Sequence, residues 1–296
     1  MITDIRFRIA NMSALSWLLI ISVVAFIASS FLWWQVVYKS PKRVWADMLK
    51  NNFATSGFTR HIESSQNGLE ADEVAQLQTG GTNLVRTKTT LVQGSDRVST
   101  EAITTDNAEY VRYLSIDTNR KTREGKPLNF SKAVGVWGKN EAGGSRQAFS
   151  QLLLGVIPTG NASPETRKQL EDFMNKHTVF VVNYETVKRE KINGREAYVY
   201  EVQLLPQTYV EMLKIYGKGV GFGDQVQQLD PAAYKNAQPT SLVVSVDILS
   251  RNVVAVSYPG NDSRKETYGS YGVIKDYKLP RKTIPMTDLQ ELLSTQ

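Results

Sequence analysis

The chain has 296 residues, contains no Cys, is 41% hydrophobic and carries a formal net charge of +6. A chain of this length forms one large domain or two small ones, and its composition is typical of a folded protein. The absence of Cys excludes disulfides, thiolate metal sites, a cysteine nucleophile and a lipid-modified N-terminal cysteine. With only two His residues, His61 and His177, a multi-histidine metal cluster is excluded as well.

An uncharged run extends from Ile9 to Tyr38 and has a strongly apolar centre. A bilayer core about 30 Å thick needs roughly 20 helical residues, so the run predicts a transmembrane anchor over 13–38 after a short cytoplasmic N-terminus over 1–12. Aromatic and basic side chains favour the headgroup layer. The residues predicted at the membrane interface are Trp33, Trp34, Tyr38, Lys39, Lys42 and Arg43.

Two other interpretations of this run remain open. A cleaved signal peptide would end near Ala28-Ser29-Ser30, but the apolar run continues through Trp33. A buried helix of a soluble protein is the third possibility. Lys and Arg near the ends slightly favour a cytoplasmic C-terminal side, but that rule applies to short loops. A domain of this length crosses the membrane largely regardless of its charge, and the short N-terminus is the easier end to leave inside. We therefore expect the domain over 39–296 to be extracytoplasmic, on the cell membrane of a bacterial cell envelope.

After the anchor, Ser40-Pro41 interrupts the helix, and an amphipathic helix follows with an apolar face of Val44, Trp45, Met48, Leu49 and Phe53. Strand signals and tight turns then predict an antiparallel meander. The expected strands cover 57–64, 82–93, 97–105 and 110–116. A polar loop is expected from Asp117 to Pro127.

The second half mixes helices and hairpins. Helices are expected over 147–156, after an N-cap at Ser163, after Pro206 and over 287–293. Asn193-Gly194 supplies a positive-φ turn for the clearest hairpin. Its arms, a second hairpin and two short closing strands are expected over 179–190, 196–205, 242–249, 253–258, 265–271 and 277–279.

This order of elements predicts an α+β fold. Strands do not alternate with crossover helices, which disfavours a parallel nucleotide-binding sheet. We expect one strongly curved antiparallel sheet, a half-open barrel, with helices on its concave face and a transmembrane helix before it.

Two segments carry a resemblance to a known family: INGREAYVYEVQLLPQTYVEML, and SLVVSVDILSRNVVAVSY followed by YGSYGVIKDYKLP. Their order of hairpin, helix and hairpin resembles the LolA-like lipoprotein-carrier fold and the LppX/LprG-type lipoproteins, and LKNNFATSGFTRH is similar to that group's opening. The resemblance extends over most of 44–285. It implies a half-open barrel around a hydrophobic cavity for acyl chains, or a platform for protein interaction. The anchor and the missing Cys depart from the family and argue against free lipid transport.

Side chains on the apolar helix faces, and one in a glycine-rich loop, are the candidates for lining such a cavity. They are Leu152, Leu153, Phe173, Leu213, Tyr216 and Phe222. Phe222 belongs to the string Gly217–Gly223, which we interpret as a helix C-cap and mobile loop or as a lid with Phe222 at its tip. The alternative is that all these side chains fill a solid core.

No residue pattern indicates catalysis. His61 is expected at the surface or rim of a strand, and His177 at a helix C-terminus, where it complements the dipole. We expect no enzyme activity, no cofactor, no metal site and no nucleic-acid partner. The leading hypothesis is a single-pass membrane protein that binds a lipid or other hydrophobic ligand in its cavity. The alternative is an anchored interaction module of a cell-envelope complex with a filled core, which would contact its protein partner through strand edges or the loop 121–126.

Overall fold

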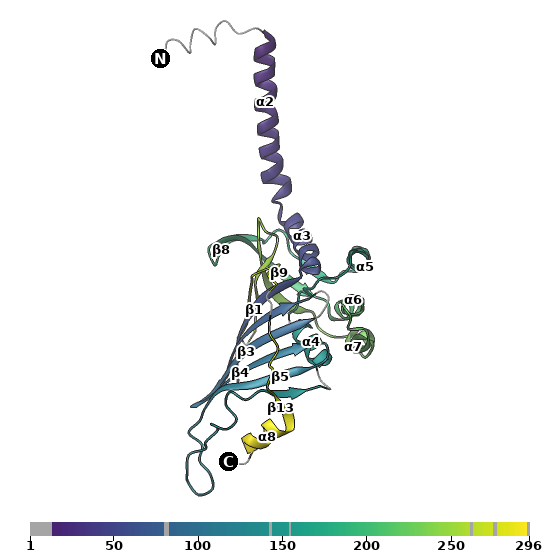
Figure 1. Ribbon diagram of the computed structural model, residues 1–296. Coiled ribbons are helices and arrows are strands. Elements are labelled where there is room, and N and C mark those ends of the chain that lie inside the picture. The colour runs from purple at the N-terminus through teal and green to yellow at the C-terminus, as the bar shows by residue number, and fades with distance from the viewer. Residues whose placement is uncertain are drawn as a thin grey trace, which may run out of the picture.

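The computed structural model describes residues 14–79, 83–141, 144–153, 155–260, 263–274 and 277–294. Helix α2 (Ala14–Trp33) and the π-helical turn η1 (Trp34–Tyr38) project away from the domain (Figure 1). The stretch Leu18–Tyr38 is long and apolar enough to cross a membrane, and none of its most apolar window is buried against the rest of the chain. The predicted N-terminus over 1–12 lies outside the described residues.

Helix α3 (Pro41–Ala54) connects the projecting helix to the domain. Ser40 stands at its N-cap position and Pro41 opens it, where a missing N–H costs nothing. Its buried face confirms the predicted amphipathic helix and adds one polar residue: Val44, Trp45, Met48, Leu49, Asn52 and Phe53.

The first half of the domain is the antiparallel meander that the sequence predicts, with one more strand than expected. Its strands are β1 (Gly57–Gln66), β2 (Leu69–Gln78), β3 (Leu84–Gln93), β4 (Asp96–Thr105) and β5 (Glu109–Asp117). The sequence does not predict β2, in which only Ala75 and Leu77 are buried. Pairing with β1 and β3 on both sides, rather than an apolar pattern, makes this segment a strand.

The second half continues the same sheet. Strands β9 (Arg195–Leu204), β10 (Thr240–Asp247), β11 (Val253–Tyr258) and β12 (Ser263–Gly269) follow one another, and β12 pairs with β1. The short strands are β6 (Gly138–Asn140), β7 (Phe180–Val182), β8 (Lys188–Ile192) and β13 (Ile284–Pro285). Within the described residues, the result is one strongly curved 13-stranded sheet that runs from β13 to β7 and does not close into a barrel (Figure 1).

Three expectations about the sheet are wrong in detail. The sheet is mixed, because β13 runs parallel to β6. Residues 277–279 form no strand. The arm predicted over 179–190 divides into β7 and β8, which both pair with β9. A turn at Asn183, whose side chain accepts a hydrogen bond from Glu185 N, separates them.

Helices α3 to α7 gather on one side of the sheet (Figure 1). They are α4 (Gly144–Leu153), α5 (Pro164–Lys176), α6 (Pro206–Gly219) and α7 (Gly223–Gln227), followed by the 3-10 turn η2 (Pro231–Tyr234) and, near the C-terminus, α8 (Met286–Ser294). Ser163 caps α5 as predicted, since its hydroxyl accepts from Thr166 N. The hydrophobic core lies between α3–α7 and the strands β1–β3 and β9–β12.

Candidate functional site

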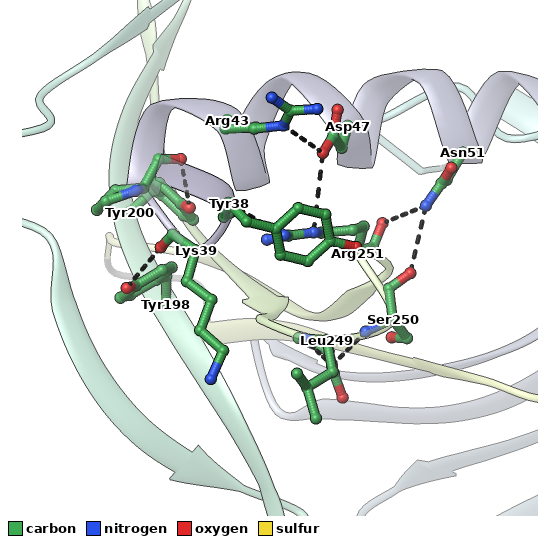
Figure 2. Close-up of polar contacts among 12 residues, drawn as sticks. Tyr38, Lys39, Arg43, Asp47, Asn51, Tyr198, Tyr200, Leu249, Ser250 and Arg251 are labelled. Carbon is green, nitrogen blue, oxygen red and sulfur yellow. Dashed lines mark hydrogen bonds and ion pairs between the residues drawn. The ribbon is translucent and has the colours of Figure 1, made fainter. Parts of the chain in front are cut away.

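The point where the projecting helix meets the domain is a dense polar cluster, the anchor junction: Tyr38, Lys39, Asp47, Tyr198, Tyr200 and Arg251 (Figure 2). Its centre is Arg251, which is 4% exposed and lies in the left-handed region at φ 57°. The guanidinium donates to the carbonyl of Tyr38 at 2.6 Å and lies 4.4 Å from the centroid of the Tyr38 ring. Its Nε is 3.8 Å from an Asp47 carboxylate oxygen.

Two tyrosines of β9 hold the next residues of the chain. The hydroxyls of Tyr198 and Tyr200 donate to the carbonyls of Lys39 and Pro41, each at 2.9 Å. Burial raises the pKa of Tyr200, so it stays a neutral donor. Carbonyls at the end of a helix have no partner within it. Arg251 and Tyr198 therefore satisfy the carbonyls of Tyr38 and Lys39 at the end of the projecting helix, and Tyr200 adds a contact at the first residue of α3, so these side chains tie the projecting helix to the domain.

The structure brings most of the predicted membrane-interface residues together here. The Trp34 ring stacks on Tyr38 at 4.4 Å, the Lys39 ammonium lies 5.7 Å from the Trp34 centroid, and Arg43 pairs with Asp47 at 3.6 Å. Trp33 is exposed beside Tyr38, and Lys42 is exposed on α3.

The predicted cavity-lining residues with described side chains lie in or against the core. Leu213, Tyr216 and Phe222 are 6%, 0% and 1% exposed, and the Tyr216 hydroxyl donates to Thr159 O at 3.0 Å. Phe173 is half-buried and stacks on His177. Leu152 and Leu153 belong to α4, and their side chains lie outside the described residues.

The glycine-rich string has a packing role that its sequence does not predict. Helix α6 continues through Gly219, and a Cβ at that position would collide with Thr166 of α5. Phe222 packs against Phe149 at a centroid distance of 5.1 Å. These glycines therefore let two helices approach each other, and Phe222 lies inside the core.

Two buried carboxylates stabilise opposite parts of the sheet. Glu266, 0% exposed, accepts from the Tyr258 hydroxyl at 2.8 Å, from Arg264, and from Tyr268. Glu101, 1% exposed, accepts from Arg86 Nε at 2.7 Å and Arg112 Nε at 2.8 Å. Burial alone would raise the pKa of Glu101, but the two arginines outweigh burial and lower it. These are interactions within the fold, and neither carboxylate lines the groove or the hollow described below.

On β1, which pairs with the strand of Glu266, Arg60 is completely buried. Its Nη2 donates to the carbonyl of Gln151 at 2.9 Å, while its Nε and Nη1 have no hydrogen-bond partner in the described structure.

A wide groove of about 1020 Å³ runs over the ends of the strands β1–β4, β11 and β12. Side chains of both charges line it, among them Glu70, Arg97 and Lys265. Nearby, His61 Nε2 lies 2.9 Å from an Asp72 carboxylate oxygen and 4.0 Å from a Glu63 oxygen. His61 is on a strand and partly exposed, as predicted. These three groups are close enough to share a metal ion, but all are solvent-accessible and His61 is already paired.

A smaller hollow of about 320 Å³ has a different character. We call it the distal hollow, and its apolar lining is Leu69, Leu91, Val98, Ile116, Leu128 and Phe130. Asp96 and Arg120, joined at 2.8 Å, lie at the same hollow. The hydrogen bond from Thr118 and the charge of Arg120 lower the pKa of Asp96, so the pair is ionised at neutral pH.

The distal hollow lies far from the projecting helix. Residues 118–130, which form one wall, belong to the long loop at the bottom of Figure 1, whereas α2 leaves at the top. The loop 121–126 is exposed and begins at an isolated bridge between Lys121 and Pro127. The sequence predicted this loop but not the hollow, because its other walls come from β2 to β5, and β2 was missed.

No family model and no curated protein matches the chain. Among solved structures, the hypothetical protein CT021 from Chlamydia trachomatis is similar over 79% of this chain and 96% of its own length, with 9% identity and a TM-score of 0.26. A TM-score this low supports no conclusion about fold or function, and the resemblance to the LolA-like family stays a prediction.

Proposed function

We propose that this protein is a non-enzymatic, membrane-anchored interaction module that presents the distal hollow to a partner protein of the cell envelope. The observation that carries the proposal is the position of an apolar hollow at the end of the domain away from the anchor. The anchor junction favours the same function, because a fixed helix direction keeps the hollow pointing away from the bilayer.

The hollow has the composition of a protein-binding site. Interface centres are apolar with few charges, and polar groups surround them. Leu91 and Leu69 are 39% and 38% exposed, so a partner side chain that covers them would remove apolar surface from water. The Asp96–Arg120 pair at the rim would add directional contacts.

The packed core favours an interaction module rather than a protein with a lipid cavity within the helix layer. Tyr216 and Phe222, both predicted to line a cavity, are enclosed by other side chains. A cavity there would need space that these aromatic rings occupy. The packing thus favours the filled-core alternative of the sequence analysis.

Site-specific photo-crosslinking in native membranes tests this function. A photoreactive amino acid at position 91 should give a protein adduct, and the same amino acid at position 114 should not. Leu114 is the matched control, since it is a strand leucine with 38% exposure that does not line the hollow. Leu91→Glu should abolish an adduct formed from a probe at position 128. Equal adducts from positions 91 and 114 would overturn the proposal.

A hydrophobic ligand is the second candidate, favoured by the apolar lining of the same hollow. Its volume of about 320 Å³ lies at the lower end of ligand sites, which span about 300–1,000 Å³. Native mass spectrometry of the full chain should then detect a bound lipid that Leu91→Glu loses and Leu114→Glu retains. A lipid-free wild-type protein that rejects added lipid would exclude this candidate.

We further propose that the domain is extracytoplasmic, with the short N-terminus inside. The chain has no Cys, so Glu124→Cys in the exposed loop introduces a single thiol. A membrane-impermeant maleimide should label it in intact cells once any outer permeability barrier is opened. Labelling that occurs only after the inner membrane is lysed would place the domain inside.

A further inference from the structure

One apolar side chain stands out at the membrane end of the domain. Leu249 is 64% exposed, more than any other large apolar residue described outside the projecting helix. It lies in the turn between β10 and β11, two residues before Arg251, whose guanidinium contacts Tyr38 (Figure 2). The Asp247 carboxylate accepts from the backbone N–H groups of Leu249 and Ser250, each at 2.8 Å, and fixes the turn.

A second turn, between β8 and β9, also lies near the point where the projecting helix meets the domain. Tyr198 touches Lys39, and the strand β9 begins three residues earlier, at the turn Asn193-Gly194 that joins it to β8. Both turn residues have positive φ, 50° and 80°, as a tight hairpin requires. Ile192 and Arg195 are paired across the tip. In Figure 1, β8 extends sideways from the domain at about the level of α3.

Positive charge is concentrated around these turns. The segments 38–47, 188–196 and 247–251 contain eight Lys and Arg and four Asp and Glu, so they supply most of the net charge of +6. Among them Lys188, Lys191 and Arg195 are exposed at the β8–β9 hairpin. Trp34 and Tyr38 mark the depth of the headgroup layer, where such rings concentrate, and Lys39 follows them directly.

We propose that the Leu249 turn and the β8–β9 tip dock on the surface of the bilayer that holds the anchor. Leu249 enters the boundary between headgroups and acyl chains. The basic side chains of the β8–β9 hairpin bind the phosphates of anionic phospholipids. The inference rests on the proposed membrane anchoring. Apolar side chains beside Lys and Arg are the features that hold proteins at a membrane surface. The attraction between these charges and the surface falls off over about 8 Å at physiological salt.

Docking at these two turns gives the domain three contacts with one membrane: the anchor and the two turns. A single helix leaves a domain free to tilt, whereas three contacts that do not lie on one line define a plane. The surface contacts therefore act together with the anchor junction to keep the distal hollow away from the bilayer.

The test uses the full chain in lipid nanodiscs with a single fluorescent label on an introduced Cys. The labelled positions are Leu249→Cys and Asn193→Cys at the turns, Phe31→Cys in the anchor, and Leu69→Cys at the distal hollow. Nanodiscs contain either phosphatidylcholine alone or a mixture with phosphatidylglycerol. Spin-labelled lipids report contact by quenching, and the emission maximum reports the polarity around the label.

We expect labels at Phe31 and Leu249 to be quenched in both lipids, and the label at Leu69 in neither. The label at Asn193 should be quenched and blue-shifted in phosphatidylglycerol discs, and Lys191→Glu with Arg195→Glu should abolish both changes. Quenching at Leu249 and Asn193 no greater than at Leu69, while Phe31 is quenched, would overturn the docking and leave the anchor intact. An unquenched Phe31 would overturn the anchor together with the docking.

Discussion

At the scale of single residues, buried ionic groups join segments that are distant in the chain. Arg251 contacts Tyr38 and Asp47, and its backbone carbonyl accepts from Asn51 at 3.2 Å. Glu101 joins β3 to β5 through Arg86 and Arg112. A buried charge is costly when it loses its partner, so these residues determine local geometry more strongly than neutral neighbours do.

Arg251→Ala should weaken the anchor junction. The substitution leaves the Tyr38 carbonyl without its donor and removes the contact with the Tyr38 ring, at an expected cost of about 1–3 kcal/mol. Arg251→Lys should restore only part of this stability, because an ammonium lacks the planar geometry of a guanidinium. Urea unfolding of the full chain in detergent measures the free energy. Equal stability of Arg251→Ala and the wild type would contradict the role of Arg251.

The lowered pKa of Glu101 predicts a stability that depends on pH. Its carboxyl has a pKa below its usual value of 4.5 in the folded chain, so the unfolded state binds protons first as pH falls. The ionic contribution is therefore complete at neutral pH and disappears as pH drops below about 4.5 towards the folded pKa. Glu101→Gln should lower the melting temperature at pH 7 and reduce the difference between pH 7 and pH 3. An unchanged difference would argue against Glu101 as its source.

At the scale of elements, contacts between neighbouring helices or strands explain features that the local sequence pattern does not. The sequence interprets Gly217–Gly223 as a loop, but α6 continues to Gly219 because Thr166 of α5 packs directly against it. Similarly, β2 has little apolar pattern and forms between β1 and β3. By contrast, α3, α5 and the β8–β9 turn carry their own signals at Pro41, Ser163 and Asn193, and all three were predicted.

Gly219→Ala should therefore destabilise the domain. The new methyl group overlaps the Thr166 side chain, and overpacking typically costs about 1–3 kcal/mol. Gly223→Ala is the matched control, because a Cβ there meets nothing within 4 Å. Thr166→Ala combined with Gly219→Ala should recover part of the loss. Thermal unfolding distinguishes the variants, and equal melting temperatures for the two alanine substitutions would refute the packing role.

At the scale of the whole molecule, one sheet unites both halves of the chain. Strands β1 and β12, about two hundred residues apart, pair over seven residues from Thr59 to Ser65. Helices from both halves cover the same core. The region after the projecting helix is consequently a single unit with that helix at one end and the distal hollow at the other (Figure 1).

Hydrogen exchange should show directly that the two halves of the chain form one cooperative unit. Strands β1, β10, β11 and β12 lie inside the sheet and should share the slowest exchange, whereas β8 and β13 at the periphery should exchange early. Exchange measured by mass spectrometry on the full chain resolves these segments. Two separate protection levels, one for 57–117 and one for 180–269, would indicate two independent domains instead.

The sequence by itself determined the elements with local chemical causes. These are the apolar helix, the helix starts at Pro and Ser residues, the Asn-Gly turn, and the strands β10 and β11 with their alternating residue pattern. Their signals lie within a few residues and need no partner. Only the tertiary structure decided that β2 is a strand, that Phe222 is buried, and that Arg251 meets Tyr38. It also brought β2 to β5 and the loop 118–130 together as the distal hollow. Each of these depends on contacts between residues distant in sequence, which hydrophobic periodicity does not encode.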